Sequence, residues 1–130
     1  MTMRVHTDKR AVERAMDKAR RAVSAGAIYF QGEAKKTLSA SGRGRKHSGL
    51  NYRSSKPGDP PTVQTGTLRR SIQSDLSQAN KGLARVGTNI KYASYLEWGT
   101  RNMAPRPFMR PTLKRSRSGM MKAIRREAER

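Results

Sequence analysis

The chain has 130 residues and carries 29 Lys and Arg against nine Asp and Glu, a formal net charge of +20. This length predicts one domain over residues 1–130. The charge indicates a polyanionic or acidic partner, with nucleic acid the first candidate and acidic protein surfaces the second. The absence of cysteine excludes disulfides, zinc-thiolate sites and thiol catalysis. No apolar run is long enough for a transmembrane helix and Met1–Arg10 lacks a signal-peptide core, so no membrane contact is expected.

A long helix is predicted after an N-terminal arm, residues 1–8, with Thr7 or Asp8 as its cap. Apolar residues then recur every three or four positions, which is the spacing of one helix face. A helix of this length spans roughly 45 Å and is expected to be the main strut of the protein. The charged residues on the opposite face indicate a solvated surface with local ion pairs. This apolar stripe consists of Val12, Met16, Ala19, Val23, Ala27, Phe30, Ala34 and Leu38.

A long loop rich in Ser, Gly and Pro is predicted over residues 39–64. Loops of this length in compact domains are usually functional or disordered. The loop is basic, with no acid before Asp59, so it is a candidate contact for DNA or for an acidic partner. A loop without a partner is the alternative that the sequence leaves open. The basic residues of this loop are Arg43, Arg45, Lys46, Arg53 and Lys56.

A hairpin is predicted after one helical turn that Thr65 or Thr67 caps. Residues 72–76 alternate between apolar and polar side chains, apart from Ser74, as in a half-exposed strand. Gln78–Gly82 is expected to turn the chain, with Asn80 and Gly82 suited to positive φ. The return strand is predicted over Leu83–Asn89. A pair of strands this short needs a helix, further strands or another subunit to be stable.

Two further helices are predicted in the last third of the chain. Tyr92–Trp98 fits a short helix that Gly99 ends. Prolines keep Met103–Phe108 extended, and Pro111 suits the first turn of a last helix that reaches about Ala128. This helix is expected to loosen near Ser116–Gly119 and to pack through its apolar residues Leu113, Met120, Met121 and Ile124.

The order of these elements predicts an α+β fold. In this fold the long N-terminal helix and the C-terminal helix pack on a small antiparallel β-sheet, and a long basic loop leaves the body. Residues 91–111 concentrate the large side chains of an aromatic-poor chain, so they form either its packing centre or its most specific contact surface. Glu97 lies near Arg101, Arg106 and Arg110. One of them is expected to pair with Glu97 and fix the following turn, either within one subunit or across a subunit boundary.

Enzymatic activity is not expected. His6 lies in a terminal arm and His47 in a basic loop, and acids are too sparse for a paired-carboxylate or two-metal site. No phosphate-binding, dinucleotide-binding or zinc motif is present, so no cofactor or metal is predicted. The charge supports contact with phosphates, but the sequence contains no known nucleic-acid-binding motif and no stacking platform. Any contact with nucleic acid is therefore expected to be sequence-independent.

Two adjacent motifs carry a resemblance to a known family. Tyr92–Thr100 reads Tyr-Ala-Ser-Tyr-Leu-Glu-Trp-Gly-Thr, and Met103–Pro111 reads Met-Ala-Pro-Arg-Pro-Phe-Met-Arg-Pro. Together they resemble the signature of the neck proteins of tailed bacteriophages. These are the head–tail joining and tail-completion proteins, or tail components, of lambda-like siphophages.

The resemblance extends upstream of these motifs. Pro57–Pro61, Thr65–Ile72 and Val86–Thr88 are similar to runs at the corresponding places in the family. In layout the resemblance covers about residues 9–128, and it is specific mainly over residues 57–111. The basic run of the long loop, Ser41–Arg53, has no counterpart in the family pattern.

The resemblance implies a non-enzymatic structural protein of the virion, assembled in the host cytoplasm. It implies a tail-completion or tail-terminator subunit that forms a sixfold ring between the capsid connector and the tail tube and surrounds the DNA channel. The implied partners are other copies of the chain, the head-side stopper and connector proteins, the tail tube protein and the DNA backbone. The alternative function is that of a sequence-independent basic nucleic-acid-binding protein.

A ring repeats one heterologous interface until it closes. Aromatic and Arg side chains dominate the energetics of such interfaces, so they are the candidate anchors here. The candidate interface residues are Tyr92, Tyr95, Glu97, Trp98, Arg106, Phe108 and Arg110.

Overall fold

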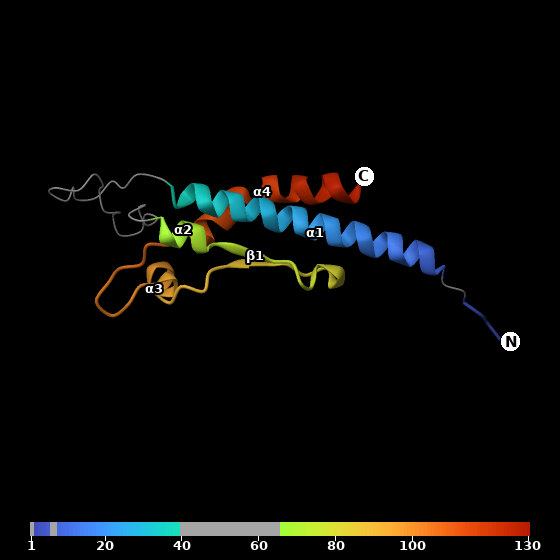
Figure 1. The fold of residues 1–130 in the computed structure, drawn as a ribbon, viewed down its shortest axis with the longest axis horizontal. Coiled ribbons are helices and arrows are strands. Elements are labelled where there is room, and N and C mark those ends of the chain that lie inside the picture. The colour runs from blue at the N-terminus through green and yellow to red at the C-terminus, as the bar shows by residue number, and fades with distance from the viewer. Residues whose placement is uncertain (1, 6–7, 40–65) are drawn as a thin grey trace.

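The computed structural model describes residues 2–5, 8–39 and 66–130 (Figure 1). These residues form an α+β fold, as the sequence predicted. Its two short strands pair antiparallel, with Ser74 opposite Val86. The elements in chain order are α1 (Lys9–Thr37), α2 (Thr67–Ser71), β1 (Gln73–Asp75), the 3-10 turn η1 (Ala79–Lys81), β2 (Arg85–Gly87), α3 (Tyr92–Trp98) and α4 (Met109–Ala128).

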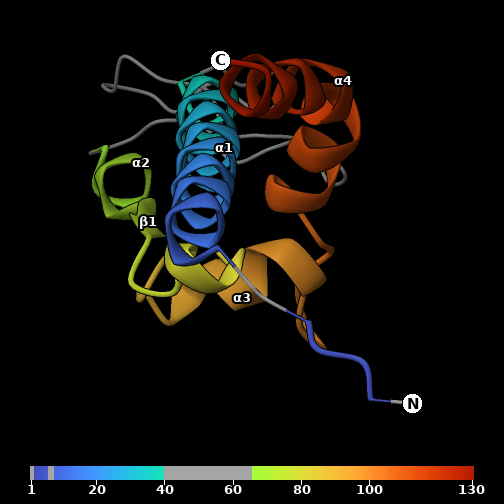
Figure 2. The same ribbon diagram turned by 90° about the vertical axis from the view of Figure 1, so that its right-hand side faces the viewer.

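Helix α1 is the axis of the molecule. In Figure 1, α4 lies along one side of α1, and the hairpin and α3 lie along the other. The end-on view in Figure 2 shows the same arrangement, with α4 and the hairpin packed on α1 from different directions. The hairpin therefore rests on a helix, which is one of the supports that its short strands require.

The buried core lies near the C-terminal end of α1. Its buried cluster consists of Ala34, Leu38, Ile72, Ala93 and Phe108. These residues come from α1, the hairpin, α3 and the start of α4, so the cluster ties the elements together. Full burial of a side chain such as that of Phe108 or Ile72 contributes about 1.5–3 kcal/mol.

Only the C-terminal half of the predicted apolar stripe of α1 is buried in the core. Ala27 and Phe30 are buried, as are the two stripe residues that follow them. Val12 and Met16, in contrast, are 42% and 48% exposed. The predicted helix is present, but its own chain leaves the N-terminal part of the stripe uncovered, because α1 continues past the ends of the hairpin and α4 (Figure 1).

The contact between α1 and α4 differs from the prediction. Helix α4 is continuous through Ser116–Gly119, and Leu113 and Met121 are 48% and 41% exposed. Its buried positions are Thr112 and Ser116, whose hydroxyls both have hydrogen-bond partners. Thr112 Oγ1 lies 2.7 Å from Thr37 Oγ1, and Ser116 Oγ donates to the Thr112 carbonyl at 2.6 Å.

Two glycines bring these helices close together. A Cβ at Gly26 of α1 would lie 2.8 Å from Cγ1 of Ile124, and a Cβ at Gly119 of α4 would meet the ring and hydroxyl of Tyr29. Small residues at both places let the helix backbones approach. This explains why α4 keeps a regular helix at Gly119, where local propensity alone predicted a weak point.

The caps and turns follow local signals in most places. Asp8 caps α1, because its carboxylate accepts a hydrogen bond from Arg10 N–H at 3.0 Å. The N-cap of α2 is Gly66 rather than Thr67, and Thr65 lies outside the described residues. Gly82 turns the hairpin with a φ of 77°, whereas Asn80 has no positive φ.

Candidate subunit interface

Glu97 lies near the end of α3, and its carboxylate reaches the first turn of α4. Its Oε2 accepts hydrogen bonds from Phe108 N–H at 2.7 Å and Met109 N–H at 3.0 Å, and its Oε1 accepts one from Arg110 N–H at 3.0 Å. The first N–H groups of a helix have no partner within that helix. Phe108, the N-cap residue of α4, makes no side-chain cap. Glu97 therefore caps α4 from a different helix.

The environment of Glu97 keeps its carboxylate charged. The residue is 6% exposed, and burial by itself raises the pKa of a carboxyl group. The backbone N–H bonds from residues 108–110 and the bond from the Arg110 side chain act in the opposite direction. They outweigh burial, so the pKa of Glu97 lies below its ordinary value of 4.5. The partial positive charge at the start of α4 favours the same form.

Arg110 is held from two sides. Its Nε donates to Glu97 Oε1 at 3.1 Å, and its Nη2 donates to the Glu97 carbonyl at 2.9 Å. Its guanidinium carbon lies 4.1 Å from the centroid of the Trp98 ring. The prediction that a nearby Arg pairs with Glu97 is confirmed for Arg110. Of the two alternatives left open, these bonds favour the one in which Glu97 orders its own subunit.

Backbone hydrogen bonds close the turn that joins α3 to α4. Thr100 and Met103 exchange two N–H···O=C bonds of 2.9 and 3.2 Å, and Arg106 N–H donates to the Leu96 carbonyl at 2.6 Å. Gly99 ends α3 with φ 78° and ψ 175°, a combination that is essentially restricted to glycine. A Cβ at this position would also lie 2.9 Å from the Met103 carbonyl oxygen. The turn therefore requires Gly99.

Three aromatic side chains of α3 face solvent. Tyr92, Tyr95 and Trp98 are 45%, 55% and 66% exposed. Their spacing of three residues places neighbouring rings on adjoining parts of the helix surface. We call these three residues and Arg110 the aromatic face. Exposed clusters of aromatic and Arg side chains are typical of protein–protein contact surfaces.

The other predicted site residues lie in different surroundings. Phe108, a predicted anchor, is 1% exposed and belongs to the core cluster, so its ring packs within its own chain and the anchor prediction is corrected. Arg106 is half-buried, and its Nε is a buried nitrogen without a hydrogen-bond partner. The predicted basic contacts lie outside the described residues; they are Arg43, Arg45, Lys46, Arg53 and Lys56.

An open apolar groove runs between α1, the hairpin and α4, and sequence analysis did not predict it. Its volume is about 470 Å³, and apolar side chains such as Phe30, Leu83 and Leu113 line it. Arg110 lines it as well, so the groove borders the aromatic face. The apolar spacing of α4 marked Leu113 as a packing position. That spacing could not show that its own chain leaves this side chain 48% exposed.

The described part of the chain offers no metal site or membrane span. Among residues 2–5, 8–39 and 66–130, no group of three or more His, Cys, Asp or Glu is placed to hold a metal ion. No helix in these ranges is both long and apolar enough to cross a membrane. The region around α3 and α4 presents exposed rings, a guanidinium held by Glu97 and an apolar groove.

Residues 6–99 match the family described as "Bacteriophage HK97-gp10, putative tail-component". The chain belongs to this family. The match runs from α1 to the end of α3 and includes the three rings of the aromatic face. No curated protein and no solved structure matches the chain. The resemblance drawn from the Tyr92–Thr100 motif is thereby confirmed at the level of the family.

A phage tail component is a structural protein of the virion, and this gives the chain its broad role and location. Such a component works through contacts with other virion proteins.

Proposed function

We propose that this tail component is a ring-forming, non-enzymatic subunit of the phage neck. It completes the tail, joins the tail to the head and surrounds the DNA channel, with six copies in the ring. The observation that carries the proposal is the aromatic face, where three rings are exposed and one of them, that of Trp98, packs against an Arg that Glu97 already fixes. A pre-ordered Arg and rigid rings lose little conformational entropy on binding, which favours their use as interface anchors.

The partners in this proposal are other copies of the chain, the head-side stopper and connector proteins, and the tail tube protein. The match to a tail-component family supports this set, because a neck ring must contact virion proteins on both its head side and its tail side. The net charge of +20 supports proximity to the genome, through contacts with the DNA backbone. A uniformly positive channel would hold the DNA tightly, so only part of this charge faces it.

Replacing Trp98 with alanine is expected to impair assembly far more than folding. Trp98 is 66% exposed, and its ring packs against Arg110, a contact that at an exposed site contributes about 0.5–1 kcal/mol. Loss of a central interface anchor typically costs roughly 2 kcal/mol or more of binding free energy. Urea unfolding measures the change in the stability of the monomer. Light scattering and negative-stain microscopy of nuclease-treated protein in high salt measure the loss of assembly.

The control for this variant is Leu76→Ala, which truncates another partly exposed apolar side chain at the end of β1. It is expected to leave assembly unchanged. If Trp98→Ala unfolds the monomer outright, Trp98 acts as a core residue and the interface role fails.

A phage with a nonsense mutation in this gene tests the role in the virion. Separate DNA-filled heads and unattached tails in the lysate would support a joining role. Tails of normal length would indicate completion, whereas overlong tails would indicate a terminator that stops growth of the tube. Intact, infectious particles would contradict the neck function.

A second candidate function is sequence-independent binding of nucleic acid. The exposed basic residues of α4 favour it, because they give one helix a dense row of charge; they are Lys114, Arg115, Arg117, Lys122, Arg125 and Arg126. Affinity for any duplex that falls steeply with salt, measured on a monomer, would support this function. Rings that persist in high salt after nuclease treatment would favour the neck function.

A further inference from the structure

We propose that the N-terminal part of α1, residues 9–21, docks into the apolar groove of a second copy of the chain. This inference rests on the proposed ring and names the surfaces that build it. Each subunit would insert its own helix end into one neighbour and receive the helix end of the other neighbour. We call residues 9–21 the inserting segment.

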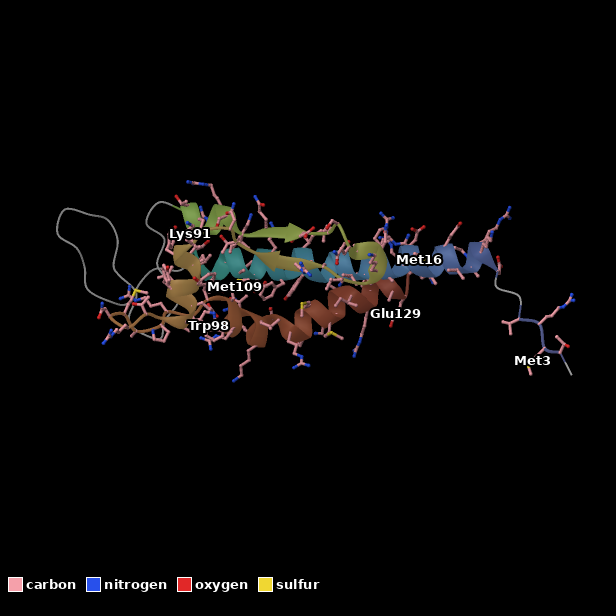
Figure 3. The ribbon with its side chains drawn as sticks, turned by 90° about the horizontal axis from the view of Figure 1, so that it is seen from below. Met3, Met16, Lys91, Trp98, Met109 and Glu129 are labelled. Atoms are coloured by element: carbon pink, nitrogen blue, oxygen red, sulfur yellow. The ribbon has the colours of Figure 1, made fainter. Side chains whose placement is uncertain are left out.

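The inserting segment carries an apolar stripe that its own chain leaves uncovered. Val12 and Met16 are 42% and 48% exposed, and Ala19 continues the stripe on the exposed surface. In Figure 3, Met16 lies on the part of α1 that projects beyond the hairpin and α4. At 1.5 Å per residue the segment is about 20 Å long. A regular apolar spacing on a projecting helix indicates a face that packs against another surface.

The groove is suited to receive apolar side chains rather than a small ligand. Its volume of about 470 Å³ lies within the range of ligand pockets. Such pockets normally present a few converging polar groups, whereas here the one charged lining residue is Arg110, which Glu97 already pairs. Leu83 and Leu113, at 40% and 48% exposed, present apolar surface to an incoming partner.

The groove cannot be filled by the inserting segment of the same copy. Val23, Ala27 and Phe30 of α1 line the groove, and α1 is one continuous helix from Lys9 to Thr37. A rigid helix that forms part of the groove cannot also turn back to occupy it. An inserting segment that occupies a groove must therefore occupy that of another copy.

Charge disfavours symmetric pairing of two inserting segments. The segment holds six Lys and Arg against two acids, a net charge of +4, so two such segments side by side would repel each other. The one charged residue that lines the groove is Arg110, which pairs with Glu97, although α4 as a whole is basic. A contact between two different surfaces is heterologous, and a heterologous contact that closes on itself produces a ring.

The groove also adjoins the aromatic face. Arg110 lines the groove and lies against the ring of Trp98, so a helix that enters the groove can extend onto the exposed rings. In Figure 3 Trp98 lies far from Met16, toward the other end of the molecule. The inserting segment shares no residue with the groove, whose lining on α1 begins at Val23, so the inserting and receiving surfaces are distinct, as a ring of identical subunits requires.

Cysteine cross-linking tests this contact directly, because the chain has no natural cysteine. Met16→Cys and Leu113→Cys are made separately, mixed and oxidised. Head-to-tail docking predicts a disulfide-linked dimer that contains one copy of each variant. Leu113→Cys mixed with Ser118→Cys, which replaces an exposed residue on α4, is the control pair and is expected to give no linked dimer above background.

Two results would overturn the inference. Oxidation of Met16→Cys alone to a linked dimer would show that two helix ends pair symmetrically. No linked dimer in the Met16→Cys and Leu113→Cys mixture, at concentrations where wild-type rings form, would show that the groove has another occupant. In the second case the wild-type rings would still support the proposed function. Failure of the docking contact can therefore be distinguished from failure of the proposed function.

Charge variants provide a second test that reads out ring assembly. Val12→Lys with Met16→Lys disables the inserting surface, and Leu83→Lys with Leu113→Lys disables the groove. Each double variant is expected to lose rings, whereas their mixture should form heterodimers through the one intact surface on each. Gln73→Lys with Ser118→Lys adds the same charge at exposed positions elsewhere and should keep rings. Rings from both disabled variants would contradict the docking contact.

Discussion

Replacing Glu97 with alanine is expected to lower the free energy of unfolding by about 3 kcal/mol or more, because each buried donor that loses its acceptor costs about 1–3 kcal/mol. Three backbone N–H groups at the start of α4 lose their acceptor, and Phe108 N–H lies in the buried core. Arg110 contributes less to the loss, because its side chain is 53% exposed and regains water. Urea unfolding of the monomer measures the change.

Glu129→Ala is the matched control for this variant. Glu129 is exposed near the C-terminal end of α4, and a surface change of this kind usually alters stability by less than about 0.5 kcal/mol. Equal stability of the two variants would show that the cap from Glu97 contributes little. A large loss confined to Glu97→Ala would show that the connection of α3 to α4 depends on this carboxylate.

The lowered pKa of Glu97 also predicts a dependence of stability on pH. A carboxyl group whose pKa is lower in the folded state stabilises that state fully above its unfolded pKa, and this contribution is lost as pH falls through the folded pKa. For Glu97 the loss therefore begins below about pH 4.5, its ordinary value. Glu97→Gln removes this contribution, so the difference in unfolding midpoint between wild type and variant should narrow as pH falls below 4.5.

The titration of Asp75 does not affect this comparison. Hydrogen bonds from Ser77 lower the pKa of Asp75 below its ordinary value of 3.8, and this group is present in both proteins. Its effect cancels in the difference between wild type and Glu97→Gln. A difference that stays constant from neutral pH to below 4.5 would contradict the assignment of the pH effect to Glu97.

The sequence predicted best those features that single residues determine locally. Asp8 starts α1 through its own side chain, and Gly99 ends α3 because of its backbone freedom. Pro111 lies in the first turn of α4, where its missing N–H costs nothing. The alternation over residues 72–76 located β1 for the same reason, since a strand's pattern repeats within a few residues.

The features that the sequence could not predict depend on which elements meet. The stripe of α1 is periodic from Val12 to Leu38, but spacing alone does not show where the covering elements end. Thr112 and Ser116 are buried on α4 because small hydroxyl side chains fit at the close contact with α1, and a hydrophobic pattern ranks such residues as outward-facing. The groove is of the same kind, since it exists where three elements fail to cover one another.

Replacing Gly99 with alanine is expected to lower the free energy of unfolding by about 3 kcal/mol or more. Two effects add. The φ of 78° and ψ of 175° lie in a region that alanine enters at a cost of about 1–3 kcal/mol. The new Cβ would also lie 2.9 Å from both the Met103 oxygen and the Pro105 nitrogen. Both atoms are backbone, so neither can rotate away. Thermal or urea unfolding measures the loss.

Two other glycines separate these effects. Gly82 has a φ of 77° but open space around its Cβ position, so Gly82→Ala should cost about 1–2 kcal/mol, the left-handed strain alone. Gly32 lies in α1 with nothing near that position, and Gly32→Ala should stabilise the helix by about 0.5–1 kcal/mol. If Gly99→Ala costs no more than Gly82→Ala, the turn after α3 relaxes around a methyl group. The aromatic face would then be supported by a pliable turn, and Glu97 would remain as the contact that fixes α3 to α4.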